Sequence, residues 1–361
     1  MELTTLDTLD QAKALIDLVY SVYGLTFHRD FIYSPERLLE LNRQGLVRSF
    51  LAIEGGTVLG HLGWIRPFFE LTRDGEPLTD AGIGEVGLSI VRPDARGKHV
   101  QTGLAMKMAE WTSANGKNGA FMKCVTHHLF SQRTAANMGG KPLALFLAGV
   151  PKWVVYDRAA EPKEAPLSTL LYYVPITPHA PSTLRIPRHL GWIEDLIRAS
   201  GAERNFVQGG PLDDGATDIE VEFQPSKRLA QVHVIHAGAD LAEKIAATNQ
   251  WLLEGHMEHI SHFLPADSVH VQRQAMALEA SAIFPAGWIP GLHRGARDVL
   301  VYCSIAAKEL DTAAIVANDD DGANLRDRVV AAWRDVKAPA PSRRQRGTGL
   351  PAGSAYRTRS G

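Results

Sequence analysis

A short basic loop between an apolar strand and an amphipathic helix is the segment best suited to chemistry. The run IGEVGLSIV predicts a strand at 83–91, and the apolar spacing that follows predicts a helix at 100–114. The loop between them holds two cations and a glycine, namely Arg96, Gly97 and Lys98. Amides at a helix start lack internal partners and, with the helix dipole, favour a bound phosphate. These residues therefore predict a phosphate-binding loop, and a solvated turn is the alternative.

The elements around this loop follow a characteristic order. The sequence predicts helices at 10–23, from Pro35 and at 130–138, and strands at 49–53, 58–64, 120–126 and 143–150. This order, together with the motif V-x-P-x-x-R-G-K at 91–98, resembles the GCN5-related N-acetyltransferase (GNAT) family over roughly residues 10 to 150. The resemblance implies an acyl-CoA-dependent N-acyltransferase that uses acetyl-CoA or another acyl-CoA as co-substrate.

The resemblance also implies which residues hold the acyl-CoA. Phosphate contacts would come from the amides of Arg96, Gly97, Lys98, His99, Val100, Gln101 and Thr102. Contacts to the pantetheine arm would come from Leu88, Ser89, Ile90 and Val91, on a strand that splays from the next one to open a slot. The family usually continues its loop as R-G-x-G-x-G, whereas this chain has His99 and Gln101 at the second and third glycine positions.

Acyl transfer to an amine needs a proton acceptor, a polarised thioester and a proton for the leaving thiolate. Glu85 resembles the position of the family's general base, and its alternative is a carboxylate on a solvated strand face. His127 and His128 follow the next predicted strand and could relay the proton. Ser131 could bond the sulfur or cap its own helix, and no tyrosine occurs in that helix to act as the acid. The expected reaction is direct transfer in a ternary complex to a primary amine of a small molecule or peptide.

Composition sets the wider limits. The 361 residues are 45% hydrophobic, which predicts a globular chain of two domains with two cores. Lys plus Arg (38) nearly balance Asp plus Glu (40), so no nucleic-acid or membrane partner is expected. Two distant cysteines, the absence of a signal-peptide pattern and the absence of a long apolar run predict a cytoplasmic protein. Cys124 is expected to be a buried structural thiol.

The second half repeats a similar order of elements without a second R-G-x-G loop. We expect an α/β (α+β) fold with two GNAT-like domains, each a central mixed, mainly antiparallel sheet flanked by helices. The expected divisions are a catalytic domain at 1–150, a linker at 151–168, a degenerate GNAT-like domain at 169–337 and a disordered basic tail at 338–361. The second domain would shape the acceptor pocket or a homodimer face.

Three histidines and two further functions complete the expectations. His256, His259 and His262 have helical spacing, and a polar helix end is favoured over a metal site, so no metal is expected.

A non-catalytic acyl-CoA sensor is the alternative function, because of His99, Gln101 and the missing tyrosine. A GNAT-shaped interaction module that uses the second domain and the tail is the third interpretation.

Overall fold

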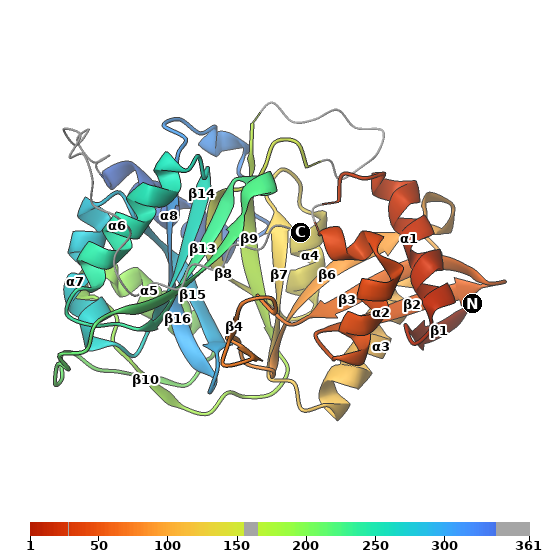
Figure 1. Cartoon of the computed structure of the whole chain (residues 1–361), viewed down its shortest axis with the longest axis horizontal. Coiled ribbons are helices and arrows are strands. Elements are labelled where there is room, and N and C mark those ends of the chain that lie inside the picture. The colour runs from red at the N-terminus through yellow and green to blue at the C-terminus, as the bar shows by residue number, and fades with distance from the viewer. Residues whose placement is uncertain (28, 155–164, 337–361) are drawn as a thin grey trace.

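A twelve-stranded sheet runs through the whole molecule, with helices on both of its faces (Figure 1). The structure is a computed structural model and describes residues 1–27, 29–154 and 165–336. In spatial order the strands are β1 (Glu2–Thr5), β2 (Val47–Glu54), β3 (Thr57–Ile65), β6 (Ile83–Val91), β7 (Gly119–Val125), β9 (Leu167–Pro175), β8 (Lys141–Val150), β15 (Phe284–His293), β16 (Arg297–Ile305), β14 (His259–Pro265), β13 (Leu229–His236) and β12 (Asp218–Gln224). The helices are α1 (Leu9–Tyr23), α2 (Pro35–Arg43), α3 (Val100–Ala114), α4 (Phe130–Asn137), α5 (Gly191–Ala199), α6 (Leu241–Glu254), α7 (Val269–Ala280) and α8 (Asp320–Asp335). Two short strand pairs, β4 (Thr72–Arg73) with β5 (Glu76–Pro77) and β10 (Ser182–Leu184) with β11 (Arg204–Phe206), lie outside this sheet.

The two halves of the chain repeat one topology. In the first half β6 is parallel to β7, α3 connects them, and β9 and β8 follow as antiparallel neighbours. In the second half β13 is parallel to β14, α6 connects them, and β16 and β15 follow in the same antiparallel way. The halves meet where β8 lies beside β15, so the strand order is mirrored about this seam. The expected mixed, mainly antiparallel sheet is thus confirmed, as one continuous sheet in which the second half repeats the strand order of the first.

Local sequence explains the first elements of the sheet. Thr8 and Gln11 form a reciprocal capping box at the start of α1, and Ser34 caps α2 just before Pro35. Gly55 and Gly56 have positive φ angles in the tight turn between β2 and β3, which is the conformation that favours glycine. Apolar residues of α1 and α2 pack on one face of the sheet, and those of α3 pack on the other face.

A domain boundary at residue 150, as expected from the sequence, would separate strand β9 from the strands with which it pairs. β9 lies between β7 and β8 and pairs with both, so residues up to Pro175 complete the sheet of the first half. Residues 155–164 of the expected linker and the expected tail at 338–361 lie outside the described residues.

Three further expectations are corrected. β1 precedes the first helix, where no strand was expected. The segment from His259 is strand β14 rather than a helix end, since all of its residues are buried between layers. The sequence around 275–284 predicts a helix that reaches Phe284, whereas α7 ends at Ala280 and β15 begins at Phe284.

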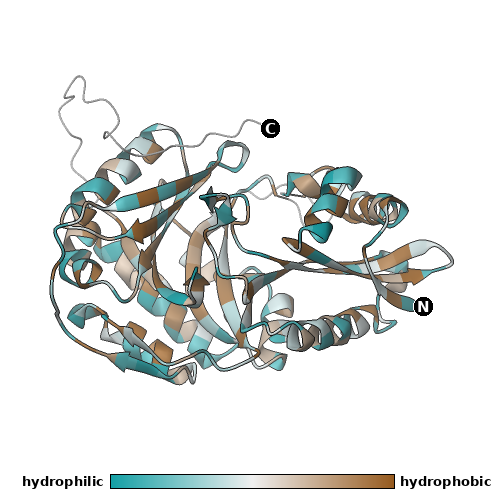
Figure 2. Ribbon diagram, turned by 60° about the horizontal axis from the view of Figure 1, so that its bottom comes forward, coloured by the Kyte–Doolittle hydropathy of each residue, from teal (hydrophilic) through white to brown (hydrophobic). Residues whose placement is uncertain are grey.

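One core continues from the first half into the second, so the expectation of two separate cores is wrong. The largest buried cluster includes Phe121 of β7, Leu145 of β8, Trp288 of β15 and Val329 of α8. Figure 2 shows apolar residues along the central strands and polar residues on the outer sides of the helices. Among the described residues, none of the helices is both long and apolar enough to cross a membrane.

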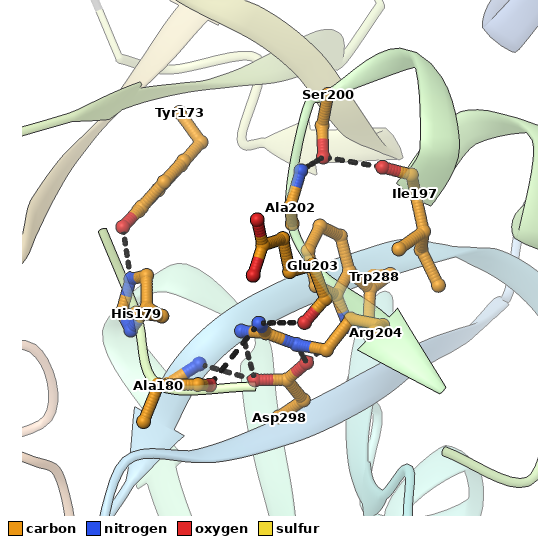
Figure 3. Close-up of polar contacts among 11 residues, drawn as sticks. Tyr173, His179, Ala180, Ile197, Ser200, Ala202, Glu203, Arg204, Trp288 and Asp298 are labelled. Carbon is orange, nitrogen blue, oxygen red and sulfur yellow. Dashed lines mark hydrogen bonds and ion pairs between the residues drawn. The ribbon is translucent and has the colours of Figure 1, made fainter. Parts of the chain in front are cut away.

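A buried ion pair ties β11 to the second half of the sheet. Arg204 Nε lies 2.7 Å from Asp298 Oδ2, and both side chains are almost fully buried (Figure 3). The same carboxylate accepts hydrogen bonds from Trp288 Nε1 and the Gly291 amide. Because its lone pairs are satisfied in this way, the buried charge is compensated.

Candidate functional site

β6 and β7 separate part of the way along their length. They pair only at Ile83, Gly84 and Glu85, which lie opposite Gly119, Ala120 and Phe121. Beyond Glu85, β6 continues to pair with β3, and β7 continues to pair with β9. The two strands therefore stop pairing beyond Glu85, and this splayed region between them is called the slot below.

A β-bulge interrupts β6 along this slot. The β3 residues His61 and Gly63 lie opposite Ile90 and Gly87, so β6 contains one extra residue, and Leu88 has φ of 53°. The buried His61 ring donates from Nδ1 to the Leu88 carbonyl over 2.7 Å. After the bulge, Leu88 and Ile90 pack towards α1 and α2 and Ser89 is exposed.

The expected phosphate loop lies at the far end of the slot. From Glu85 to Val91 is six residues, or about 20 Å of extended strand. Arg92 then pairs with Asp94 through two contacts of 3.0 Å, and this pairing lowers the pKa of the Asp94 carboxyl. Arg96 and Lys98 are exposed and, in the described chain, form no salt bridge, so the loop keeps a positive charge.

The backbone of the loop presents amide donors to solvent. Across the described residues, no group accepts a hydrogen bond from the amides of residues 99–102 at the start of α3. Gly97 has φ of 80°, and a Cβ built there would meet no atom within 4 Å. Four free amides, a helix N-terminus and two cations thus lie together in this loop, which is called the cradle below, and such an arrangement favours an anion.

The two residues that depart from the family motif behave differently. His99 adopts a left-handed conformation (φ 58°) that suits the glycine of the motif, and its side chain is exposed. Gln101 is half-buried, and its Oε1 atom is buried without a hydrogen-bond partner. At position 99 the chain thus has a positive φ without a glycine.

Glu85 lies in a group of charged and aromatic side chains. Its Oε1 is 2.6 Å from Arg29 Nη2, and its Oε2 is 4.0 Å from Lys123 Nζ. The Lys123 ammonium also lies over the rings of Phe68, Phe121 and Phe146 at 5.6–5.9 Å. Only 13% of the Glu85 side chain is exposed, so Glu85 is not the solvated surface carboxylate of the alternative interpretation.

The other expected catalytic residues do not join Glu85. His127 and His128 follow β7, which is parallel to β6, so they lie at the loop end of the slot, about 20 Å of strand beyond Phe121. Ser131 is not the helix cap, because α4 begins at Phe130 and Leu129 holds the N-cap position. The Ser131 hydroxyl neighbours the thiol of Cys124, whose pKa is raised to about 12 by burial. Cys124 is therefore a buried thiol, as expected.

The expected histidine group is not brought together, because His256 precedes β14 whereas His259 and His262 lie on its two faces. His259 bonds the Leu147 carbonyl and Ser261, whereas His262 lies 3.2 Å from Asn249 of α6. Residues three apart in a strand point to opposite faces, so the helical spacing was misleading. Within the described ranges, no group of His, Cys, Asp and Glu side chains is arranged to hold a metal ion.

The corresponding loop of the second half is already filled. Gly238 and Ala239 donate their amides to Thr217 Oγ1 and the Gly215 carbonyl, and a Cβ at Gly238 would lie 1.9 Å from that carbonyl oxygen. Asp240 at the N-cap of α6 adds a negative charge. Segment 215–217 therefore occupies the place where a ligand would lie, and the second half has no counterpart of the cradle at this loop.

Sequence reasoning missed Arg29, Lys123 and the residues of the second half that approach them. The sequence does offer Phe68 as a wall of an acceptor pocket, with core packing as the favoured interpretation. Lys123 carried one signal, because a lysine inside an otherwise apolar strand costs free energy unless it has partners. Phe68 has a positive φ of 50°, which no sequence pattern indicates.

Comparison with known proteins finds solved structures that are similar to about half of this chain. No family model and no curated protein matches the chain. Many solved structures match about half of it. One is a putative acetyltransferase, yncA, from Salmonella typhimurium with acetyl-CoA (15% identity, TM-score 0.38, 50% of this chain and 97% of that chain). Another is the ribosomal-protein-S18-alanine N-acetyltransferase from Escherichia coli (9% identity, TM-score 0.37, 50% of this chain and 96% of that chain). A third is an aminoglycoside 6'-N-acetyltransferase complexed with coenzyme A (13% identity, TM-score 0.34, 50% of this chain and 99% of that chain). Over the length of one domain, the chain is thus similar to solved structures of GNAT-family acetyltransferases.

Proposed function

We propose that the protein is an acyl-CoA-dependent N-acyltransferase whose active site lies in the slot between β6 and β7. The observation that carries the proposal is the slot itself, which has a carboxylate at its closed end and free amides at its open end. The distance of about 20 Å along β6 suits a molecule with a pyrophosphate at one end and a reactive thioester at the other. Acetyl is the simplest acyl group.

Each part of the slot has a task in this proposal. The amides of residues 99–102 and the cations Arg96 and Lys98 hold the pyrophosphate, and the edge of β6 from Leu88 to Val91 holds the pantetheine arm. Glu85 accepts, through a water molecule, the proton of the acceptor ammonium. The freed amine attacks the thioester carbonyl and the carbon–sulfur bond breaks. The nitrogen then gives up its second proton, which reaches the leaving thiolate through water.

Binding of acetyl-CoA is the first test. We expect Gly97→Asp to abolish binding measured by calorimetry, because it places a carboxylate in the phosphate cradle. Gly201→Asp is the matched control, since Gly201 has nearly the same φ (79°) and equally open surroundings but lies after α5 in the second half. Failure of the wild-type chain to bind acetyl-CoA and longer acyl-CoAs would overturn the proposal.

Thiol release in the presence of a panel of primary amines is the second test. Glu85→Gln keeps the shape of the side chain but removes the base, so we expect kcat to fall about 100-fold or more while the affinity for acetyl-CoA is unchanged. Equal rates for the variant and the wild type would assign the base to another group.

An acyl-CoA sensor is the second candidate. The observation in its favour is the contact of Arg29 with Glu85 at 2.6 Å, because an ion pair makes a carboxylate a weaker base. Tight acyl-CoA binding without thiol release from any amine would support the sensor over the enzyme.

A further inference from the structure

The second half of the chain closes over the group around Glu85. The Phe68 ring packs against His233 of β13 and Phe263 of β14, with centroids 4.7 and 5.1 Å apart. Arg73 forms an ion pair with Asp218 of β12, and Thr79 bridges to His293 of β15. Through these contacts of the segment that follows β3, strands β12, β13 and β14 approach Glu85 and Lys123.

Polar atoms without partners face this junction. The structure leaves Glu222 Oε2, Gln231 Oε1 and His233 Nε2 buried with no hydrogen-bond partner. Glu222 and Gln231 lie directly opposite each other on β12 and β13, and His233 lies two residues beyond Gln231, so all three share one face. Buried polar atoms cost free energy when they are unpaired, so such a group indicates a place where a ligand supplies the missing bonds.

Charges from both halves meet at the same place. Gln224 links Glu222 Oε1 to Lys227 Nζ through hydrogen bonds of 3.1 and 3.0 Å. Burial, with a smaller contribution from Arg29 of the first half, lowers the pKa of Lys227 to about 8. Solvent still reaches the junction, because 30% of the Lys123 side chain and 23% of the Arg29 side chain are exposed.

Lys123 is the cation with unused capacity. Arg29 is engaged by Glu85 at 2.6 Å, whereas the described partners of the Lys123 ammonium are three aromatic rings and Glu85 Oε2 at 4.0 Å. An ammonium has three donors, so Lys123 can bind an anionic group beside Glu85. In an α-amino acid one carbon joins the amine to the carboxylate. The two groups therefore lie close enough together to contact Glu85 and Lys123, whose charged atoms are 4.0 Å apart.

We infer that the acceptor is a free α-amino acid, with its amine at Glu85, its carboxylate at Lys123 and its side chain against Glu222, Gln231 and His233 of the second half. This inference rests on the proposed function and names its substrate class. The amine loses a proton to Glu85 through water and forms the amide bond, while the carboxylate and side chain serve only for recognition.

The experiment compares the twenty L-amino acids with their carboxamides in the thiol-release assay. We expect the acids to have kcat/KM values about tenfold or more above those of the matching amides, since a charged hydrogen bond is lost in the amide. Lys123→Met should raise KM for the acids about tenfold with little effect on the amides, and Lys123→Arg should restore part of the loss. Lys308→Met is the control, because Lys308 is exposed and lies beyond β16.

Equal kcat/KM values for acids and amides would overturn the inference even if transfer to amines is observed. A second measurement tests the site without turnover. Saturation-transfer NMR detects binding of the same panel to the chain saturated with coenzyme A. If no amine releases thiol, the transferase proposal fails, and selective binding of acids over amides still supports the recognition site. If no amino acid binds to that complex, the recognition site itself is excluded.

Discussion

Two neighbouring loop residues, Gly97 and His99, share a backbone conformation that only one of them adopts at low cost. Both have positive φ angles, 80° and 58°, and both are exposed. Glycine has no Cβ to clash in this region, whereas histidine is strained there. The amides that follow His99 are the ones that face solvent, so the strained residue orients the donors of the cradle.

Relief of this strain is testable. We expect His99→Gly to stabilise the folded chain by about 1 kcal/mol and to leave acetyl-CoA affinity equal or higher. His99→Ala is the control, because it removes the imidazole but keeps the Cβ and hence the strain. Urea unfolding and calorimetry measure both properties, and weaker acetyl-CoA binding by His99→Gly would show that the imidazole itself contacts the ligand.

Among the elements, β8 and β15 form the seam that joins the halves, and they pair directly only at Ala144 and Gly287. Gly287 has φ of 140°, and a Cβ there would lie 2.2 Å from the Leu143 carbonyl oxygen. β14 approaches the same seam through His259, whose Nδ1 donates to the Leu147 carbonyl over 2.8 Å. The angle at which the second half meets the Glu85 group depends on this close approach.

Gly287→Ala tests the seam. Because the clash is with backbone and cannot be relieved by a rotamer change, we expect a loss of about 2–4 kcal/mol in the free energy of unfolding. Gly295→Ala has a positive φ (75°) and open surroundings, and it should cost only about 1 kcal/mol. Equal losses in the two variants would mean that the seam tolerates a side chain.

Across the whole molecule, buried neutral histidines occur in both halves. Burial lowers the pKa values of His61, His259 and His293 to about 4 and that of His262 to about 3. The unfolded chain has histidine pKa values near 6.5, so between pH 6.5 and pH 4 it binds more protons than the folded chain. Folding stability is therefore complete above pH 6.5 and is lost as the pH falls towards 4.

Urea unfolding at pH 7, 6 and 5 measures this loss. Each histidine contributes up to about 1.4 kcal/mol per pH unit in that window, so the four together should give a steep decline. Asp94, whose pKa is lowered by Arg92, protonates only below this window and does not produce the effect. A stability that stays constant from pH 7 to pH 5 would contradict the buried neutral state of these rings.

The elements with local causes were predictable from the sequence. The strand, basic loop and helix at 83–114, the turn at Gly55 and Gly56 and the start of α2 at Pro35 all follow from capping, glycine chemistry and apolar spacing within a few residues. For the same reason the sequence alone predicted the phosphate-binding loop, whereas Glu85, at the other end of the strand, came from the resemblance to the GNAT family.

Tertiary structure decided what depends on pairing between distant segments. The insertion of β9 between β7 and β8, the strand at His259 and the seam at Gly287 are non-local, and strand pairing has no signature within one short window of sequence. Glu85, Lys123 and Glu222 are far apart in the chain, so their common junction appears only when the sheet brings the two halves together. The sequence therefore predicted where a phosphate could bind, and the folded arrangement decided which residues surround Glu85.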